Sequence, residues 1–444
     1  MFNELDESRL KSIHLKITAL SSAGNFLDGY DIAIISVAIL LLKNEYSLSS
    51  LDQTLLLGST IIGMIFGGIL GGIITDLKGR KYIYMWDMLL FILFTFLTAI
   101  SQSFNELLIF RLLLGIAIGA DYAISPTIIA EYSPSRLRGR LLTVNGVAWF
   151  VGAALSYGAG FMLAPYGSIG WRVMFLLGII PAALVLFLRS SISESPRWLA
   201  EKGRIEEAVS SAEKVVGSVG EVNTARGRKS GFKLLFAAEY RKSTIFVLSF
   251  WFILDAVSYA IALNGPTFIS NTYNLTSGDA SLISAMIALV AIVGAVMAFF
   301  VIDTTGRRKV TIYGFIGMAL TLFAASISVM LSMGILPVIF LIILFEISEE
   351  FGPGITNSIY PQELFPTGVR ATAQGLGTTV SRIGALVGIF AFTLAADLLN
   401  GFAYALIMLA LLSVAGIIIS IAYGPETSGL SLEQASGEIN PSPQ

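Results

Sequence analysis

Long apolar runs alternate with short polar stretches along this chain of 444 residues. A helix needs roughly 20 mostly apolar residues to cross the hydrocarbon core of a bilayer. The runs are continuous and lack the every-other-residue alternation of a β-barrel, so they predict helices. We expect an all-α integral membrane protein with twelve transmembrane helices, at residues 17–42, 54–74, 82–101, 107–130, 141–164, 171–189, 243–269, 280–302, 310–332, 335–358, 368–397 and 400–423.

Two polar motifs between these runs occur twice. In one, a Glu is followed by Pro at +3 and Arg at +7; in the other, an Asp is followed by Gly at +3 and Arg at +4. The copies lie 232 residues apart (131 to 363) and 227 residues apart (76 to 303). Two unrelated motifs at nearly one spacing predict two pseudo-symmetric halves of six helices. We therefore divide the chain into a first half (1–189), a linker with short amphipathic helices (190–242), a second half (243–424) and a loose polar tail (425–444).

Lysine and arginine collect at one end of the expected bundle. Apart from Lys43, Arg111, Arg172 and Arg382, every cation lies in the N-terminal segment, in a loop that follows an even-numbered span, or beside such a loop. Cytoplasmic loops carry an excess of Lys and Arg. The distribution predicts a multi-pass protein of the cell membrane whose two termini, linker and tail face the cytoplasm.

Composition narrows the function classes. Charged residues make up 13% of the chain, against about 25% in soluble domains, and a net charge of −2 without a basic patch does not suit nucleic acid. There is no Cys and one His, His14, which excludes disulfides and thiol catalysis and leaves little from which to build an intramembrane enzyme. We expect no enzyme activity, no metal, no cofactor, no role for His14 and no cleavable signal before the first span.

The repeated motifs resemble those of the major facilitator superfamily, in its sugar-porter-like branch, which includes sugar, phosphate, aromatic-acid and organic-cation carriers. The resemblance covers essentially the whole chain and rests on Asp76 to Arg80, Arg111, Glu131 with Arg138, Glu194 to Arg197, Asp303 with Arg307, Glu363 with Arg370, and Pro425 to Thr427. It implies two halves that rock about a central site. It also implies that these acids and arginines form gates, which pair when the cavity opens outward and separate when it opens inward, a task for which the arginine fork is suited. The alternative is that the basic loops only set the topology.

Acidic residues lie inside several expected spans. An acid at mid-span costs about 3 kcal/mol on insertion scales, so it needs a water-filled cavity, a partner or a proton. The acids are Asp28, Asp31, Asp121, Asp255, Glu346, Glu349 and Glu350, in spans 1, 4, 7 and 10, which the resemblance implies are the cavity-lining helices. We expect Asp28, Asp31, Asp121 and Glu346 to carry the coupled proton. Asp87, near the end of span 3, is expected to reach the surface or a loop.

Span 7 has a polar face. Trp251, Asp255 and Tyr259 recur every four residues, so they lie along one side of a helix. Arg382 is expected to be the one well-buried cation among the spans. Because a buried charge without a partner is too costly to keep for packing, its expected partner is Asp255 or a glutamate of span 10.

The same stretches resemble the phosphate:proton symporters. The similar patterns are Trp251-Phe252-x-x-Asp255-x-x-x-Tyr259, Gly119-Ala120-Asp121-Tyr122 and Phe351-Gly352-Pro353. The resemblance implies that Tyr122, Trp251, Asp255 and Tyr259 contact the solute and that Asp28 or Asp31 forms a proton route with Asp121. Arg382 stands where that family has Lys, Glu350 where it has Asn, and Trp149 near the position of a sugar-porter Gln. We add these three residues to the candidate substrate site.

The combined expectation is a monomeric secondary transporter that moves a small polar solute together with a proton by alternating access. The resemblance in span 7 favours an anion, phosphate or an organic acid. A sugar or an organic cation stays an alternative, because many acids and one Arg repel an anion unless most of the acids are neutral. A transporter-like receptor that binds without transport is a further alternative. The expected partners are the solute, a proton and the lipid bilayer, and no nucleic acid.

Overall fold

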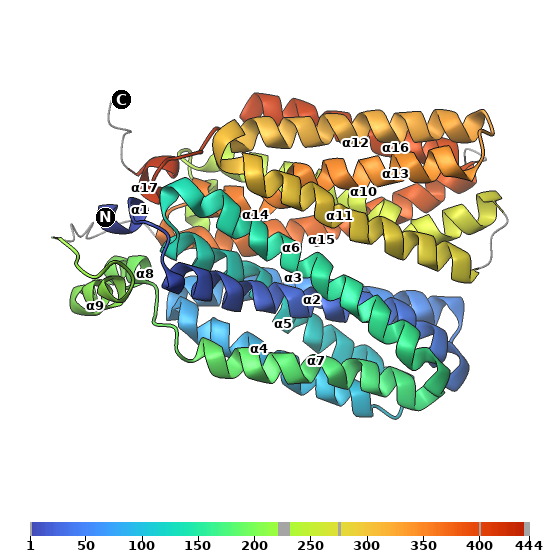
Figure 1. Ribbon diagram of the computed structural model, residues 1–444, viewed down its shortest axis with the longest axis horizontal. Helices are drawn as coiled ribbons and strands as arrows, with labels where there is room; N and C mark the ends of the chain where they lie inside the picture. The colour runs from blue at the N-terminus through green and yellow to red at the C-terminus, as the bar shows by residue number, and fades with distance from the viewer. Residues whose placement is uncertain (1, 221–230, 274–276, 399–400, 439–444) are drawn as a thin grey trace. The chain divides into compact units, whose positions relative to one another are not determined.

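The computed structural model describes residues 2–220, 231–273, 277–398 and 401–438, and the regular elements in these ranges are helices (Figure 1). Twelve long helices correspond to the twelve expected spans, which confirms the predicted fold class. They are α2 (Ser12–Glu45), α3 (Ser50–Lys78), α4 (Arg80–Ile100), α5 (Phe104–Tyr132), α6 (Arg138–Leu163), α7 (Gly167–Arg189), α10 (Arg241–Tyr273), α11 (Ser277–Thr305), α12 (Arg307–Met330), α13 (Ile335–Phe351), α15 (Arg370–Leu398) and α16 (Phe402–Tyr423). Within the described ranges, eight stretches are long and apolar enough to cross a membrane by length and composition, and one of them contains both α6 and α7.

The expected span 335–358 is not one continuous helix. Helix α13 ends at Phe351, Gly352 has φ −116° and ψ −105°, and α14 (Pro353–Leu364) begins at the next residue. Proline has no N–H to donate and suits the first position of a helix, so Pro353 ends α13 and starts α14. A Cβ on Gly352 would lie 2.5 Å from Cα of Gly314, so α12 packs directly against this break.

Short helices form the parts between and outside the long ones. The linker contains α8 (Pro196–Glu201), α9 (Ile205–Val216) and the 3₁₀ helix η3 (Phe232–Phe236), and its residues 221–230 lie outside the described residues. The chain begins with α1 (Asn3–Asp6). The tail is not loose as expected, because α17 (Leu432–Ala435) buries Leu432 and Glu433. Residues 439–444 of the tail lie outside the described residues.

The two halves repeat the same helix pairing. In the first half α2 packs on α6, α3 on α5 and α4 on α7; in the second, α11 packs on α13 and α12 on α16. A Cβ on Gly152 would lie 1.9 Å from the carbonyl oxygen of Phe26, which brings α6 onto α2, and a Cβ on Gly388 would lie 1.9 Å from that of Ala256, which brings α15 onto α10. Small residues let helix backbones approach in this way.

Contacts divide the chain into two compact units. The first contains Met1–Arg241, Pro361–Thr379 and Gly429–Gln444, and the second contains Lys242–Tyr360 and Val380–Ser428. The turn after α14, the start of α15 and the end of the tail therefore belong to the first unit, although they come from the second half of the sequence.

Candidate functional site

A buried ion pair joins α10 to α15 in the second unit. Nη1 of Arg382 donates to Oδ2 of Asp255 at 2.8 Å and to the hydroxyl of Tyr259 at 2.5 Å. The exposed fractions of Asp255 and Arg382 are 5% and 4%. Trp251, one turn from Asp255 on α10, is buried as well. The sequence prediction placed Trp251, Asp255 and Tyr259 on one helix face and gave Asp255 or a glutamate of span 10 as the partner of Arg382. The structure shows the Arg382 guanidinium held by the Asp255 carboxylate and the Tyr259 phenol.

Three glutamates follow on α13 beside the helix break. Glu349 and Glu350 are buried and Glu346 is partly buried, and none of the three forms an ion pair with a described Lys or Arg. Oε1 of Glu350 lies 2.5 Å from the position that a Cβ on Gly354 would take, so this carboxylate rests on the first turn of α14. The N-terminus of a helix stabilises negative charge. The broken helix thus presents carboxyl groups that pair with no Lys or Arg in the described part of the chain.

A second buried ion pair lies in the first unit. Nη1 of Arg111 on α5 donates to Oδ2 of Asp31 on α2 at 2.5 Å, and the guanidinium of Arg111 lies 5.4 Å from the ring centre of Phe175. Arg111 has no exposed surface. The structure therefore places Arg111 in the interior beside a proposed proton carrier, and not among the other residues of the gate motifs.

Arg189 at the end of α7 is a site residue that sequence reasoning missed. It donates to Asp87 at 3.2 Å and to Asp121 at 3.0 Å, and its guanidinium lies 3.8 Å from the ring centre of Tyr84. Asp87 is 3% exposed, so the expectation that it reaches the surface or a loop is wrong. The expectation that Arg382 is the one well-buried cation among the spans is wrong too. The signal that could have pointed to Arg189 was that two acids in neighbouring spans, Asp87 and Asp121, had no cation assigned to them.

Asp28 lies near these pairs but outside them. It is 2% exposed, and its Oδ2 has no hydrogen-bond partner among the described residues. The same holds for Nε1 of Trp149 and Oδ1 of Asn145, on the face of α6 that packs against α2. A buried polar atom without a partner costs about 1–3 kcal/mol, so these atoms are suited to receive a proton or a solute. Tyr122, which follows Asp121 on α5, is half-buried.

A group of acids and arginines, called the charged network below, occupies one end of the first unit. Its members are Asp6, Asp76, Arg80, Glu131, Arg138, Arg197, Glu363, Arg370 and Glu433. At its centre Glu131 accepts from Arg80 at 2.8 and 3.1 Å and from Arg370 at 2.9 Å. Asp76 accepts from the backbone and hydroxyl of Thr372, both at 2.7 Å. The network therefore ties the start of α15 to α3 and α5.

Asp6 and Glu433 are members of the charged network that the sequence prediction omitted. Glu433 accepts from Arg197. Burial by itself would raise the pKa of the Glu433 carboxyl, but the Arg197 guanidinium together with other nearby charge and hydrogen bonds lowers it to about 2. Nothing in the local sequence marks either acid, because both lie in terminal segments where charge is ordinary.

The Gly-Arg turn of the repeated Asp motif is Gly79-Arg80 in the first copy and Gly306-Arg307 in the second. A glutamate side chain caps the helix that follows it in both halves. The carboxylate of Glu194 accepts from the backbone N–H groups of Arg80 and Lys81 at 3.0 and 3.1 Å. Glu426 accepts in the same way from Arg307 and Arg308 at 2.9 and 3.2 Å. Both acids therefore bind backbone N–H groups in the first turn of a helix, which have no partner within the helix itself. Burial raises the pKa of the Glu194 carboxyl. Glu194 is thus a cap for α4 and not a partner of Arg197.

Asp303 and Arg307 repeat the pair of Asp76 and Arg80 in the second unit. Their charged atoms lie 2.8 Å apart, against 3.1 Å in the first copy. Ser428 donates to the carbonyl of Asp303 and accepts from Arg307, each at 3.0 Å. The motif that repeats in the sequence therefore repeats in its contacts.

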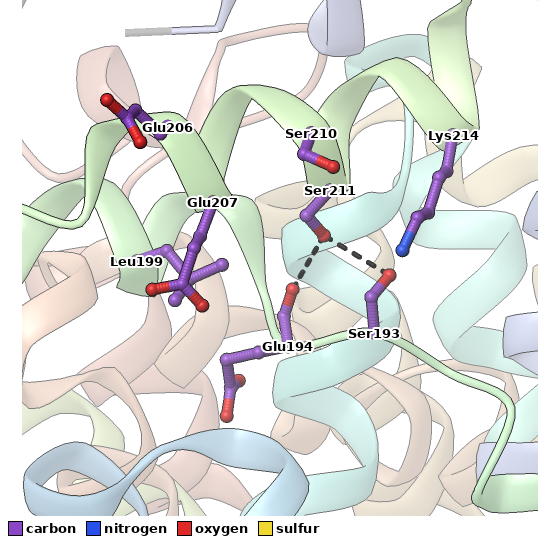
Figure 2. Close-up of a pocket in the computed structure, with 8 residues that line it drawn as sticks. All are labelled: Ser193, Glu194, Leu199, Glu206, Glu207, Ser210, Ser211 and Lys214. Carbon is purple, nitrogen blue, oxygen red and sulfur yellow. Dashed lines mark hydrogen bonds between the residues drawn. The ribbon is translucent and has the colours of Figure 1, made fainter.

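A pocket of about 310 Å³ lies on the linker (Figure 2). Its lining comes from α8, α9 and the segment before them: Ser193, Glu194, Leu199, Glu206, Glu207, Ser210, Ser211 and Lys214. The hydroxyl of Ser211 donates to the carbonyl of Glu194 at 2.7 Å and to Ser193 at 3.2 Å. These bonds hold α9 against the segment that supplies the Glu194 cap. The described residues contain no group of three or more His, Cys, Asp or Glu placed to hold a metal ion.

Comparison with known proteins gives one consistent result. Residues 17–438 match the family model described as "Sugar (and other) transporter". The chain is 33% identical over 434 residues to the putative metabolite transport protein YaaU of Escherichia coli (strain K12), covering 97% of this chain and 96% of that protein. It is 27% identical over 503 residues to the probable inorganic phosphate transporter 1-6 of Arabidopsis thaliana, covering 98% and 96%. The solved structure of the proton:xylose symporter XylE bound to 6-bromo-6-deoxy-D-glucose matches with a TM-score of 0.85 at 23% identity, covering 96% and 99%.

The long helices of the described residues and the transporters among the relatives identify a multi-pass membrane transporter and not an enzyme. The chain belongs to the sugar (and other) transporter family, and it shares the fold of XylE, a symporter of the major facilitator superfamily. The resemblance found in the sequence is thereby confirmed.

Proposed function

We propose that this transporter is a proton-coupled symporter of one small polar solute, working by alternating access. The observation that carries the proposal is the buried group of Asp255, Arg382 and Tyr259. Replacing a buried ion pair by well-packed apolar residues is often neutral or stabilising, so packing alone gives no reason to keep one. Asp28, Asp31 and Asp121 of the first unit are proton carriers in this proposal, in addition to Asp255, and the proton coupling named for XylE supports it.

An anion, phosphate or an organic acid, is the solute class proposed. Asp255 and Arg382 neutralise each other, so an anion reaches the guanidinium only when Asp255 takes up a proton or turns away. Protonation of Asp255 frees the arginine in the same step that binds the proton, which would couple the two ligands. The plant phosphate transporter among the relatives supports this solute class.

A sugar or an organic cation is the second candidate, and the glutamates of α13 favour it. Glu346, Glu349 and Glu350 have no cationic partner among the described residues. When ionised they attract a cation and repel an anion; when neutral they offer hydrogen bonds to the hydroxyls of a sugar. An anion carrier would have to keep these groups protonated while it binds its solute.

The orientation proposed follows from the distribution of Lys and Arg. The N-terminus, linker and tail face the cytoplasm of the cell, and the protein works as a monomer. The charged network is then the cytoplasmic gate, which pairs while the cavity is open to the outside and separates when the cavity opens inward.

Solute uptake into proteoliposomes with an imposed pH gradient tests the proposal. Phosphate, carboxylates, sugars and organic cations are offered separately, with Asp255→Asn and with the exposed control Glu239→Gln. The expected result is anion uptake that an inward-directed proton gradient increases, that no longer depends on this gradient in Asp255→Asn and that Glu239→Gln leaves intact. Uptake of sugars or cations alone selects the second candidate. Binding without counterflow of labelled solute would identify a receptor instead.

A further inference from the structure

The N-terminal helix α1 is buried against the linker. Phe2 and Leu5 have no exposed surface and pack in one apolar cluster with Tyr132 of α5 and Trp198 of α8. Residues Ala208, Ala212 and Val215 of α9 complete this cluster. The first residues of a chain are usually poorly ordered unless something ties them down. Helix α1 therefore has a fixed position on elements of the first half and the linker.

Polar bonds fix α1 further. The carboxylate of Glu4 accepts from the backbone N–H of Gly220 at 3.0 Å, and Nζ of Lys11 donates to the carbonyl of Val216 at 2.9 Å. The hydroxyl of Ser135 donates to the carbonyl of Asp6 at 3.0 Å. All of these partners lie before residue 241, so these bonds attach α1 to the first half and the linker.

Asp6 bridges two arginines of the charged network. Its Oδ1 accepts from Nη2 of Arg138 at 2.9 Å and its Oδ2 accepts from Nη2 of Arg197 at 2.8 Å. Both guanidinium groups have no exposed surface, and Asp6 is 5% exposed. Each arginine also pairs with an acid from the other part of the chain: Arg138 with Glu363 at 3.6 Å and Arg197 with Glu433.

Asp6, Glu363 and Glu433 come from different parts of the chain, and this decides which of them move when the proposed gate opens. Glu363 and Glu433 come from the second half and the tail, so they are the acids that leave when the proposed gate opens. Asp6 is held by Phe2 and Leu5 on the first half, so it stays. A buried arginine that loses its last carboxylate is strongly unfavourable, and Asp6 prevents this for Arg138 and Arg197 alike.

We propose that Asp6 is a resident counter-ion and positioning residue that lets the gate open. Asp6 holds the two arginines in place. Because each arginine also pairs with Asp6, Arg138 binds Glu363 less tightly and Arg197 binds Glu433 less tightly. Without Asp6, opening takes Glu363 from Arg138 and Glu433 from Arg197 and no longer leaves the Asp6 carboxylate with them. Removing Asp6 therefore favours the closed gate. If Asp6 only stabilised the closed gate, its removal would favour the open gate instead. This inference rests on the alternating-access function proposed above.

Thiol labelling at one buried position measures gate opening, because the chain contains no native cysteine. Thr378 is fully buried, and its Cβ lies 3.3 Å from the position that a Cβ on Gly68 of α3 would take. Thr378→Cys is nearly isosteric and becomes accessible when α15 leaves α3. The rate of its reaction with a small methanethiosulfonate reagent is measured in purified full-length protein.

The expected result is that Asp6→Asn slows labelling at least about fivefold, within the usual range of coupling between sites. Phe2→Ala, which undocks α1, slows it as well, and Asp6→Glu restores the rate. Glu7→Gln is the matched control, since Glu7 is the exposed acid next to Asp6, and it leaves the rate unchanged. Faster labelling in Asp6→Asn, or no change, would overturn the proposal.

Glu363→Gln separates this inference from the gate proposal itself. Loss of that carboxylate weakens the closed gate, so labelling at position 378 rises if the charged network is a gate. No rise with Glu363→Gln contradicts the gate, whatever Asp6→Asn does. A rise with Glu363→Gln together with no slowing in Asp6→Asn contradicts only the role of Asp6.

Discussion

Nη1 of Arg382 and Oδ2 of Asp255 lie 2.8 Å apart and form the buried ion pair between α10 and α15. Arg382→Gln leaves the Asp255 carboxylate buried without its cation, and breaking a buried pair costs about 3–5 kcal/mol. The double variant Asp255→Asn with Arg382→Gln removes both charges. We expect it to regain most of the lost stability and none of the transport. Thermal unfolding followed by tryptophan fluorescence in detergent checks the first outcome, and additive losses in the two single variants would contradict it.

Arg189 gives a second stability prediction. Arg189→Gln removes the cation shared by Asp87 and Asp121, both buried, so we expect a loss of about 3 kcal/mol or more. Arg204→Gln is the matched control. Its ion pair with Glu207 spans 2.6 Å and the two side chains are 49% and 59% exposed, so its loss has little effect on stability. Equal losses in the two variants would show that burial does not govern the effect.

Alanine is expected to change stability by different amounts at three glycine positions, because their backbone angles and neighbouring atoms differ. Gly79 has φ +110°, and a Cβ there would lie 2.4 Å from Oε2 of Glu194; Gly203 has φ +75° with nothing within 4 Å; Gly58 has open space as well and no positive φ. Left-handed backbone costs an L-residue roughly 1–2 kcal/mol. We expect Gly58→Ala to be neutral or slightly stabilising, Gly203→Ala to lose about that amount, and Gly79→Ala to lose more. Melting temperatures of the three variants give the order.

His14 predicts a pH dependence outside the spans. Burial, with a smaller effect of Lys11, lowers the pKa of His14 below its ordinary value of 6.5. The folded state therefore disfavours the protonated imidazole, so stability is full above pH 6.5 and falls as the pH drops below it. Nδ1 of His14 accepts from the backbone N–H of Lys11 at 3.0 Å, a bond that the amide of His14→Gln can replace. We expect the melting temperature to fall less between pH 7.5 and 5.5 in His14→Gln than in the unchanged chain; an equal fall would count against this role.

Much of the fold could be predicted from the sequence because its signals are local. Apolar length gives each helix, and the repeated Glu and Asp motifs give the two halves. The break at Gly352 could not be read from hydropathy, since residues 335–358 form one mostly apolar run and the acids in it, such as Glu349 and Glu350, mark no helix end. Proline at 353 was the available signal, but proline also occurs inside membrane helices such as α5, at Pro126.

The site could be predicted only where the partners lie on expected spans. The polar face of α10 pointed to Asp255, and the cost of a buried charge pointed to its pairing with Arg382. Arg189 and Asp6 gave no such signal. Each stands at a segment end where solvent was the default expectation, and only the packing of distant segments encloses them. Charge in a terminal or loop position therefore carries little information about burial until the tertiary contacts are known.

The make-up of the first unit has a consequence for biosynthesis. The unit includes Pro361–Thr379 and the segment from Gly429 onward, yet a chain is synthesised from its N-terminus and begins to fold from that end. While the first six helices assemble, Glu363 and Glu433 do not yet exist, whereas Asp6 precedes these helices in the chain and is translated before them. Of the three acids in the ion pairs of Arg138 and Arg197 described above, Asp6 is therefore the one present at that stage. It pairs with both guanidinium groups before Glu363 and Glu433 are made.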